Sequence, residues 1–292
     1  MTPRRALLAL HAAVLLFGFA GLFGKWLALS PLLIVLGRTA IAAAVLACVR
    51  VHARAVGRRR FALRLAGNGI VLAVHWIAFF AAIQASDVAT GLLGFATFPL
   101  FTLAFGVAVG GERASRAEVG AALLVVLGLV VLTPAPSFAD ATFVGLAWGA
   151  LSGATFALLA LVNRRHAADH AAVDIAFAQN FWAAVVLLPV VLVAAAAPAQ
   201  LGHVGWRELG LLALLGVGCT ALAHTLFVTS LRELSAATAS VAVGLEPVYG
   251  IVLAYFLLGE TPSLRSLAGG VLILAASFVV AAGLRRPRPR RR

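Results

Sequence analysis

The chain alternates between long apolar runs and short polar connections. Ten runs approach the roughly 17 to 25 residues that a helix needs to cross a bilayer. Hydrocarbon offers backbone N–H and C=O groups no partners, so we expect helices, whose backbone hydrogen bonds are internal. The runs lie near residues 6–25, 31–50, 65–84, 88–109, 117–133, 142–162, 172–195, 208–230, 235–258 and 264–284. The pattern therefore predicts an all-α integral membrane protein with ten transmembrane helices.

Polar landmarks inside and after the runs recur at a separation of 148 residues. They are a threonine, a proline and a Gly-Glu pair, at Thr90 and Thr238, Pro99 and Pro247, and Gly111-Glu112 and Gly259-Glu260. Such a match indicates an internal repeat. Five helices per half is an odd number, so the second half has to enter the membrane from the opposite face. We therefore predict two inverted five-helix repeats, residues 1–135 and residues 136–292 with the basic tail, around a central cavity.

Basic residues are concentrated in alternate connections. Nineteen of the 23 Lys and Arg residues fall in the N-terminal segment, the even-numbered connections and the C-terminal tail. Three, Lys25, Arg207 and Arg265, fall in the other connections, and Arg38 lies inside a run. Because positive charge is retained on the cytoplasmic side, we predict a multi-pass protein of the inner (plasma) membrane with both termini in the cytoplasm.

Composition narrows the class of function. With 63% hydrophobic and 11% charged residues and a mean hydropathy of +1.05, a water-soluble domain is not expected. The net charge of +13 follows the topology, so the predicted partners are the lipid bilayer and a small-molecule substrate, without nucleic acid, and the expected state is a monomer. Cys48 and Cys219 define neither a disulfide framework nor a metal site. Because phosphate-binding glycine motifs and a convergent nucleophile and base are also lacking, we expect no cofactor and no enzymatic activity.

The repeated landmarks resemble a known family. Two copies of a run ending in Gly-Glu, followed by a polar turn and a glycine-containing run, resemble the EamA-type transporters of the drug/metabolite transporter superfamily, most of all its amino-acid exporters. Leu-Glu-Pro-Val at 245–248 and Leu-Gly-Glu at 258–260 are most similar to the signature of the second half. The resemblance implies ten helices around a central cavity and movement of small metabolites, often outward. The first copy departs from the pattern at Phe98, where the second has Glu246, which leaves the substrate open.

Two charges, Arg38 and Glu246, lie deep within the runs, away from their ends, where an unpaired charge is costly. Arg38 is about 11 Å and Glu246 about 20 Å from the outer end of its run, at about 1.5 Å per residue, and a long arginine side chain spans much of that difference. We therefore predict an intramembrane charge pair. Its role stays open between fixing the packing of the helices, contacting a zwitterionic substrate, and, for Glu246, taking up a proton.

Histidines and aromatic residues are the other candidates for the cavity. His75 and His224 occupy nearly equivalent positions in the third and eighth runs, and aromatic residues surround both. They are interpreted either as hydrogen-bonding partners between helices or as residues that line the cavity and are available to a substrate. The predicted substrate-binding residues are His75, Phe79, Phe98, Trp148, Phe156, His224, Phe227 and Glu246.

The spacing of glycines indicates close packing between helices. Gly145, Gly149 and Gly153 recur every fourth residue, as do Gly106 and Gly110, and small residues at this spacing let helices approach closely.

Pro99 and Pro247, at matching positions in the fourth and ninth runs, are predicted hinges, because proline removes a backbone hydrogen bond inside a helix. A static kink is the other interpretation.

Taken together, these features favour a secondary transporter that works by alternating access. We expect it to export small metabolites, above all neutral or aromatic amino acids, because the cavity has aromatic faces and few fixed charges. A phosphate carrier would need several Lys or Arg residues within its runs. A passive channel and a broad-specificity drug efflux carrier are the alternatives.

Overall fold

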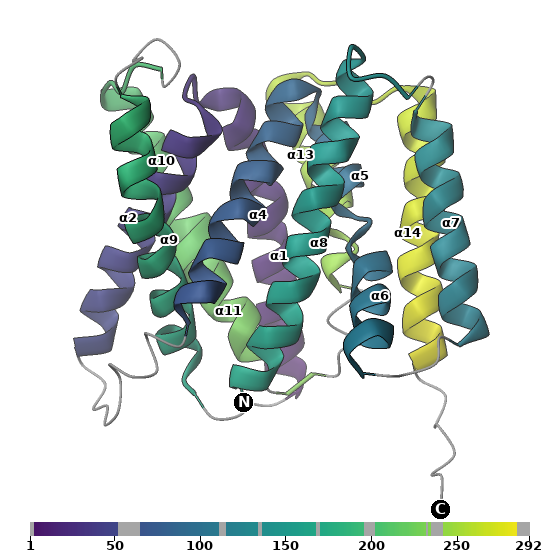
Figure 1. The fold of residues 1–292 in the computed structure, drawn as a ribbon, viewed down its shortest axis with the longest axis horizontal. Helices are drawn as coiled ribbons and strands as arrows, with labels where there is room; N and C mark the ends of the chain where they lie inside the picture. Colours follow the sequence, from purple (N-terminus) through teal and green to yellow (C-terminus); the bar gives the residue numbers. More distant parts are fainter. Residues whose placement is uncertain are drawn as a thin grey trace, which may run out of the picture.

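The computed structural model describes residues 3–51, 65–110, 115–133, 136–167, 170–195, 202–231, 233–234 and 242–284. The regular elements in these residues are helices, arranged side by side in a bundle (Figure 1). They are α1 (Pro3–Trp26), α2 (Pro31–Val51), α4 (Ala66–Ala85), α5 (Val88–Phe95), α6 (Phe98–Gly110), α7 (Arg116–Leu132), α8 (Ala141–Ala167), α9 (Ala172–Ala194), α10 (Trp206–Gly216), the π-helical turn η2 (Val217–Leu222), α11 (Ala223–Ser230), α13 (Glu246–Leu258) and α14 (Leu264–Leu284).

The predicted all-α class is confirmed. Within the described residues, seven helical segments are long and apolar enough to cross a membrane, α5–α6 and α10–α11 each counting as one. Helices over Glu246–Leu258 and Leu264–Ala276 are apolar but shorter.

The fourth predicted span is not one continuous helix. The chain turns at Ala96 and Thr97, and α6 begins at Phe98. In the second half, a turn at Gly244 and Leu245 precedes α13. Residues 235–241 of the predicted ninth span lie outside the described residues.

The prolines of the repeat begin helices and do not bend them. Pro99 and Pro247 are the second residues of α6 and α13, where a helix does not need the missing N–H group. The interpretation that each proline bends a continuous helix is therefore corrected. The two helices are both 13 residues long, and their first and last residues are separated by the 148 positions of the sequence repeat.

The Gly-Glu pair of the second half has a structural role. Gly259 has a φ of 70° and ends α13 in the left-handed conformation that glycine adopts most easily. A carboxylate oxygen of Glu260 accepts a hydrogen bond from the backbone N–H of Val88 at 2.9 Å, at the start of α5. The second half thus satisfies a helix terminus of the first. The other landmarks, Thr238, Gly111 and Glu112, and the basic tail lie outside the described residues.

Helices of the first half pack mainly on helices of the second. α4, α5 and α6 pack on α8, α2 packs on α9, and α1 packs on α11 and α13. α7 and α14 lie side by side at one edge of the bundle (Figure 1). The central helices α1, α4, α5, α8, α11 and α13 enclose the largest group of buried apolar side chains.

Glycines permit the closest of these contacts. A Cβ atom at Gly149 of α8 would lie 2.8 Å from the backbone oxygen of Gly91 and 2.8 Å from the Cα of Gly94. A Cβ atom at Gly153 would lie 2.8 Å from the backbone oxygen of Phe95. α5 and α8 are therefore in backbone contact, as the spacing predicted. Gly106 of α6 has open space around it, with no atom within 4 Å of the Cβ position.

We expect Gly149→Ala to destabilise the protein by about 1–3 kcal/mol, the usual cost of overpacking, because the added methyl meets backbone that cannot rotate away. Gly106→Ala is the matched control and should be neutral or slightly stabilising, because alanine is the better helix former by about 1 kcal/mol. Thermal melting in detergent measures both. Equal melting temperatures for the two variants would contradict the α5–α8 contact.

Candidate functional site

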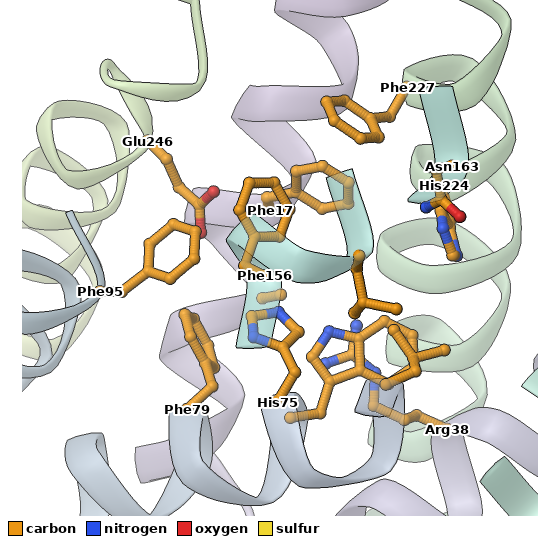
Figure 2. A pocket seen from close by; sticks show the side chains of 14 residues that line it. Phe17, Arg38, His75, Phe79, Phe95, Phe156, Asn163, His224, Phe227 and Glu246 are labelled. Atoms are coloured by element: carbon orange, nitrogen blue, oxygen red, sulfur yellow. The ribbon is translucent and has the colours of Figure 1, made fainter. Parts of the chain in front are cut away.

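A pocket lies among the central helices (Figure 2). Its aromatic wall consists of Phe17, Trp76, Phe79, Phe95, Phe156 and Phe227. Its polar side chains are Arg38, His75, Asn163, His224 and Glu246. The cavity has a volume of about 50 Å³, counted as the space open to the centre of a water molecule. One water needs roughly 10–15 Å³ on this measure, so the cavity leaves room for a few waters.

The aromatic wall is a connected set of rings. Phe156 of α8 is at its centre, with ring centroids 5.2 Å from Phe95, 5.9 Å from Phe227 and 5.5 Å from His75. These distances are typical of edge-to-face and tilted aromatic pairs. The rings of the wall come from five different helices, so the wall joins the two halves of the chain around the cavity.

His75 is fixed by a hydrogen bond to α8. Its Nδ1 is 2.9 Å from the backbone oxygen of Ser152 and 2.9 Å from the hydroxyl of the same residue. A carbonyl oxygen only accepts, so this network assigns the proton to Nδ1 and leaves Nε2 as an acceptor. Both sequence-based interpretations of His75 therefore apply, since the side chain joins two helices and lines the pocket.

His224 and Asn163 supply further polar atoms. Among the described residues, the buried Nδ1 of His224 has no hydrogen-bond partner, so His224 lines the pocket without bonding to another helix through this atom. The amide nitrogen of Gln179 donates to the side-chain oxygen of Asn163 at 2.5 Å. This bond fixes the Asn163 amide and leaves its own N–H groups for other partners.

Arg38 projects from α2 and is 1% exposed. Its Nε donates to the hydroxyl of Thr220 at 2.9 Å, and its Nη2 donates to the backbone oxygen of Cys219 at 3.4 Å. The guanidinium carbon lies 3.8 Å from the centre of the Trp76 ring, an arrangement that stabilises a cation.

Glu246 is the first residue of α13 and is 3% exposed. Among the described residues, no donor or cation bonds to its carboxylate, although a carboxylate at the start of a helix is favoured by the helix dipole. In Figure 2, Glu246 and Arg38 lie on opposite sides of the pocket, with Phe156 and His75 between them. The predicted intramembrane charge pair is therefore corrected from a direct contact to two charges that attract each other across one pocket, because the direct contacts of Arg38 are with Thr220, Cys219 and Trp76.

The structure brings six of the eight predicted substrate-binding residues to the pocket. They are His75, Phe79, Phe156, His224, Phe227 and Glu246. Phe98 is corrected to a buried residue outside the lining, since its ring packs against Phe95 and Phe156 with centroids 5.7 Å and 5.4 Å away. Trp148 is corrected to the outer surface of the bundle, where it is 40% exposed.

The sequence-based list omits several lining residues. Trp76 is adjacent to His75, and Asn163 is a polar residue at the end of a run, so both had a local signal. Phe17 and Phe95 had no such local signal in the sequence, because many phenylalanines of this chain lie outside the pocket. Within the described residues, no group of three His, Cys, Asp or Glu side chains is close enough together to hold a metal ion.

Comparisons with known proteins agree with this fold. The model of the EamA-like transporter family matches the chain twice, over residues 4–133 and 143–282, which confirms that the chain contains two copies of one unit. An uncharacterized transporter of Archaeoglobus fulgidus is 29% identical over 69% of this chain and 70% of its own length. The pseudopaline exporter CntI of Pseudomonas aeruginosa is 28% identical over 73% of this chain and 72% of its own length.

A protein of known crystal structure shares the fold. The TM-score is 0.64 at 23% sequence identity, and the match covers 96% of this chain and 99% of that protein. The two family matches, the transporter relatives and the apolar helical bundle lead to one conclusion: the chain is a multi-pass membrane protein that belongs to the EamA-like transporter family.

Proposed function

We propose that this protein exports neutral amino acids, including aromatic ones, across the inner (plasma) membrane by alternating access. The observation that carries the proposal is the aromatic pocket with a cation and a carboxylate on opposite sides (Figure 2). A relative that is named as an exporter supports outward transport.

The pocket suits a solute with an apolar body and few charges. Phe156 and its neighbours present ring faces and edges, which pair well with aromatic or branched apolar side chains. Arg38 is the one Lys or Arg side chain among the lining residues. A sugar phosphate or nucleotide sugar would need several such cations, so these classes fit poorly.

Glu246 is proposed to bind the ammonium group of the substrate. Its carboxylate lacks a partner among the described residues, and a buried carboxylate is stabilised when a cation joins it. The substrate ammonium supplies that cation while it is bound.

Alternating access is supported by the interrupted helices. α6 and α13 begin at repeat-related positions next to the pocket, and interrupted helices at matching positions are typical of transporters with two inverted halves. We propose ten spans in two inverted repeats, with the turns before Pro99 and Pro247 as hinges.

Hydrogen bonds join helix ends and connections at one face of the bundle. Lys25 donates to the backbone oxygen of Ser86 at 2.6 Å, and Arg207 donates to the backbone oxygen of Trp26 at 2.9 Å. The contact between Glu260 and Val88 belongs to the same set. All three lie at helix ends or connections that the charge pattern assigns to the outer side, so we propose that the structure is closed to the outside.

Export and cargo are tested in proteoliposomes that contain the purified protein. We expect labelled phenylalanine to be transported, and unlabelled tryptophan and methionine to compete for it. Phe227→Ala should weaken competition by about tenfold, because a lost aromatic contact and its buried area are worth about 1.4 kcal/mol or more. Trp148→Ala is the matched control outside the pocket and should leave competition unchanged. Competition by triose phosphates and not by amino acids would refute the cargo assignment.

Counterflow separates a carrier from the two alternatives. Because an alternating-access carrier reorients with its cargo, unlabelled phenylalanine on one side should accelerate uptake of labelled phenylalanine several-fold. A passive channel shows neither this acceleration nor saturation. A broad-specificity efflux carrier would be indicated if lipophilic dye cations competed as well as the amino acids.

Topology is tested by single cysteines in a background that lacks Cys48 and Cys219. An impermeant thiol reagent added outside intact cells should label Ser137→Cys and Thr261→Cys, which are exposed positions in connections assigned to the outside. Arg116→Cys, exposed on the opposite side, should react only after the membrane is permeabilised. Outside labelling at position 116 would overturn the inverted arrangement.

A further inference from the structure

Arg38 is a buried cation, and the protein accepts hydrogen bonds from only some of its N–H donors. It is 1% exposed and lines the pocket. Among the described residues, no carboxylate forms a salt bridge with it, and its known acceptors are one hydroxyl and one backbone oxygen. A guanidinium carries five N–H donors and keeps its charge in proteins, so donors of this group remain for another molecule.

A π-helical turn supplies the backbone acceptor. In an α-helix, the N–H of Ala223 would bond to the oxygen of Cys219, four residues earlier. Here that N–H bonds to the oxygens of Gly218 and Thr220. In the turn η2, the oxygen of Cys219 therefore lacks its usual α-helical donor, and it accepts a hydrogen bond from Nη2 of Arg38. Single π-helical turns within α-helices are often found at functional sites.

The same turn orients the hydroxyl acceptor. The hydroxyl of Thr220 donates its hydrogen to the backbone oxygen of Leu215 at 2.8 Å. Its lone pairs are then left to accept from Nε of Arg38 at 2.9 Å. A β-branched side chain of this kind has few rotamers, so the hydroxyl presents a fixed acceptor to the guanidinium.

These contacts leave one edge of the guanidinium open. Thr220 accepts from Nε and Cys219 accepts from one N–H of Nη2. These two N–H groups form the side edge of the guanidinium. The ring of Trp76 covers one face at 3.8 Å. Nη1, together with the second N–H of Nη2, has no acceptor among the described residues. Two parallel N–H groups on one edge match the two oxygens of a carboxylate.

We propose that Arg38 binds the carboxylate of the transported solute, and that Thr220 on the π-helical turn is the residue that positions it. This inference rests on the proposed function and refines it, because a carboxylate at Arg38 and an ammonium at Glu246 define a zwitterionic solute. The opposite walls on which Arg38 and Glu246 lie (Figure 2) set the orientation of the solute, with its side chain among the phenylalanines.

The test compares phenylalanine with phenylalaninamide, which lacks the carboxylate and keeps the ammonium and the ring. Binding to the purified protein in detergent is measured by calorimetry. The wild type should bind phenylalanine at least tenfold more tightly than the amide, because hydrogen bonds between charged groups are the strong ones. Arg38→Gln should reduce this ratio to about twofold or less, mainly by weakening the binding of phenylalanine.

Thr220→Val keeps the charge and removes the hydroxyl acceptor. We expect it to lower the ratio several-fold while binding of the amide stays unchanged. Thr225→Val is its matched control, since the Thr225 hydroxyl donates to the backbone oxygen of Ala221 and does not contact Arg38; the ratio should remain that of the wild type. Thr220→Val also provides the test if Arg38→Gln does not fold.

The outcomes separate the two proposals. A wild type that binds neither compound would overturn the proposed function and this inference with it. A wild type that prefers phenylalanine, together with Arg38 and Thr220 variants that keep the same preference, would overturn the inference alone. In that case the role of Arg38 would be to hold α2 against α10 and η2.

Discussion

Backbone hydrogen bonding in hydrocarbon is the constraint on which the rest of this structure depends. Lipid provides no partners for N–H and C=O groups, so irregular backbone is tolerated only where the protein itself satisfies it. Two of the described irregular positions within the bundle illustrate this rule. The Thr97 hydroxyl bonds to the backbone oxygen of Gly94 at 2.7 Å, and the N–H of Leu245 bonds to the oxygen of Ala242 at 3.0 Å.

The same constraint explains why the pocket lies where it does. Phe95 immediately precedes one interruption, Glu246 immediately follows another, and His224 and the partners of Arg38 lie at or next to the π-helical turn. Each irregularity leaves backbone groups without their usual helical partners or changes the direction of side chains. Each lies among the central helices. The polar chemistry of the site is therefore concentrated at positions where regular helices end or change register.

Much of the fold was predictable because segments that contact lipid have to be apolar, so hydropathy along the sequence indicates where the helices lie. The run predicted at 31–50 is the helix Pro31–Val51, and the run at 172–195 is Ala172–Ala194. The break at Ala96 and Thr97 was missed because the sequence stays apolar through it. Pro99 marked the region, but proline is favoured at the start of a helix as well as at a kink, and the local sequence does not distinguish these cases.

The site was less predictable than the fold. Trp148 and Trp76 lie in equally apolar runs, and a helix with lipid on one side and protein on the other has no polar face to indicate its orientation. Polar residues were better guides, because Arg38, His75, His224 and Glu246 all reach the pocket. Their partners were not predictable, since Arg38 bonds to a threonine 182 residues away whose acceptor geometry depends on a change in helix register.

That separation also has a consequence for the synthesis of the protein. At roughly 5–20 residues per second, the ribosome adds Thr220 about 10 to 40 s after Arg38. Throughout this interval α2 carries a cation within an apolar segment and the π-helical turn is not complete, while α9, on which α2 packs, is complete only once residue 194 has been added. Arg38 has to be accommodated meanwhile by the insertion machinery, by water or by lipid headgroups. The second half of the chain therefore completes the environment of a charge that the first half brings into the membrane.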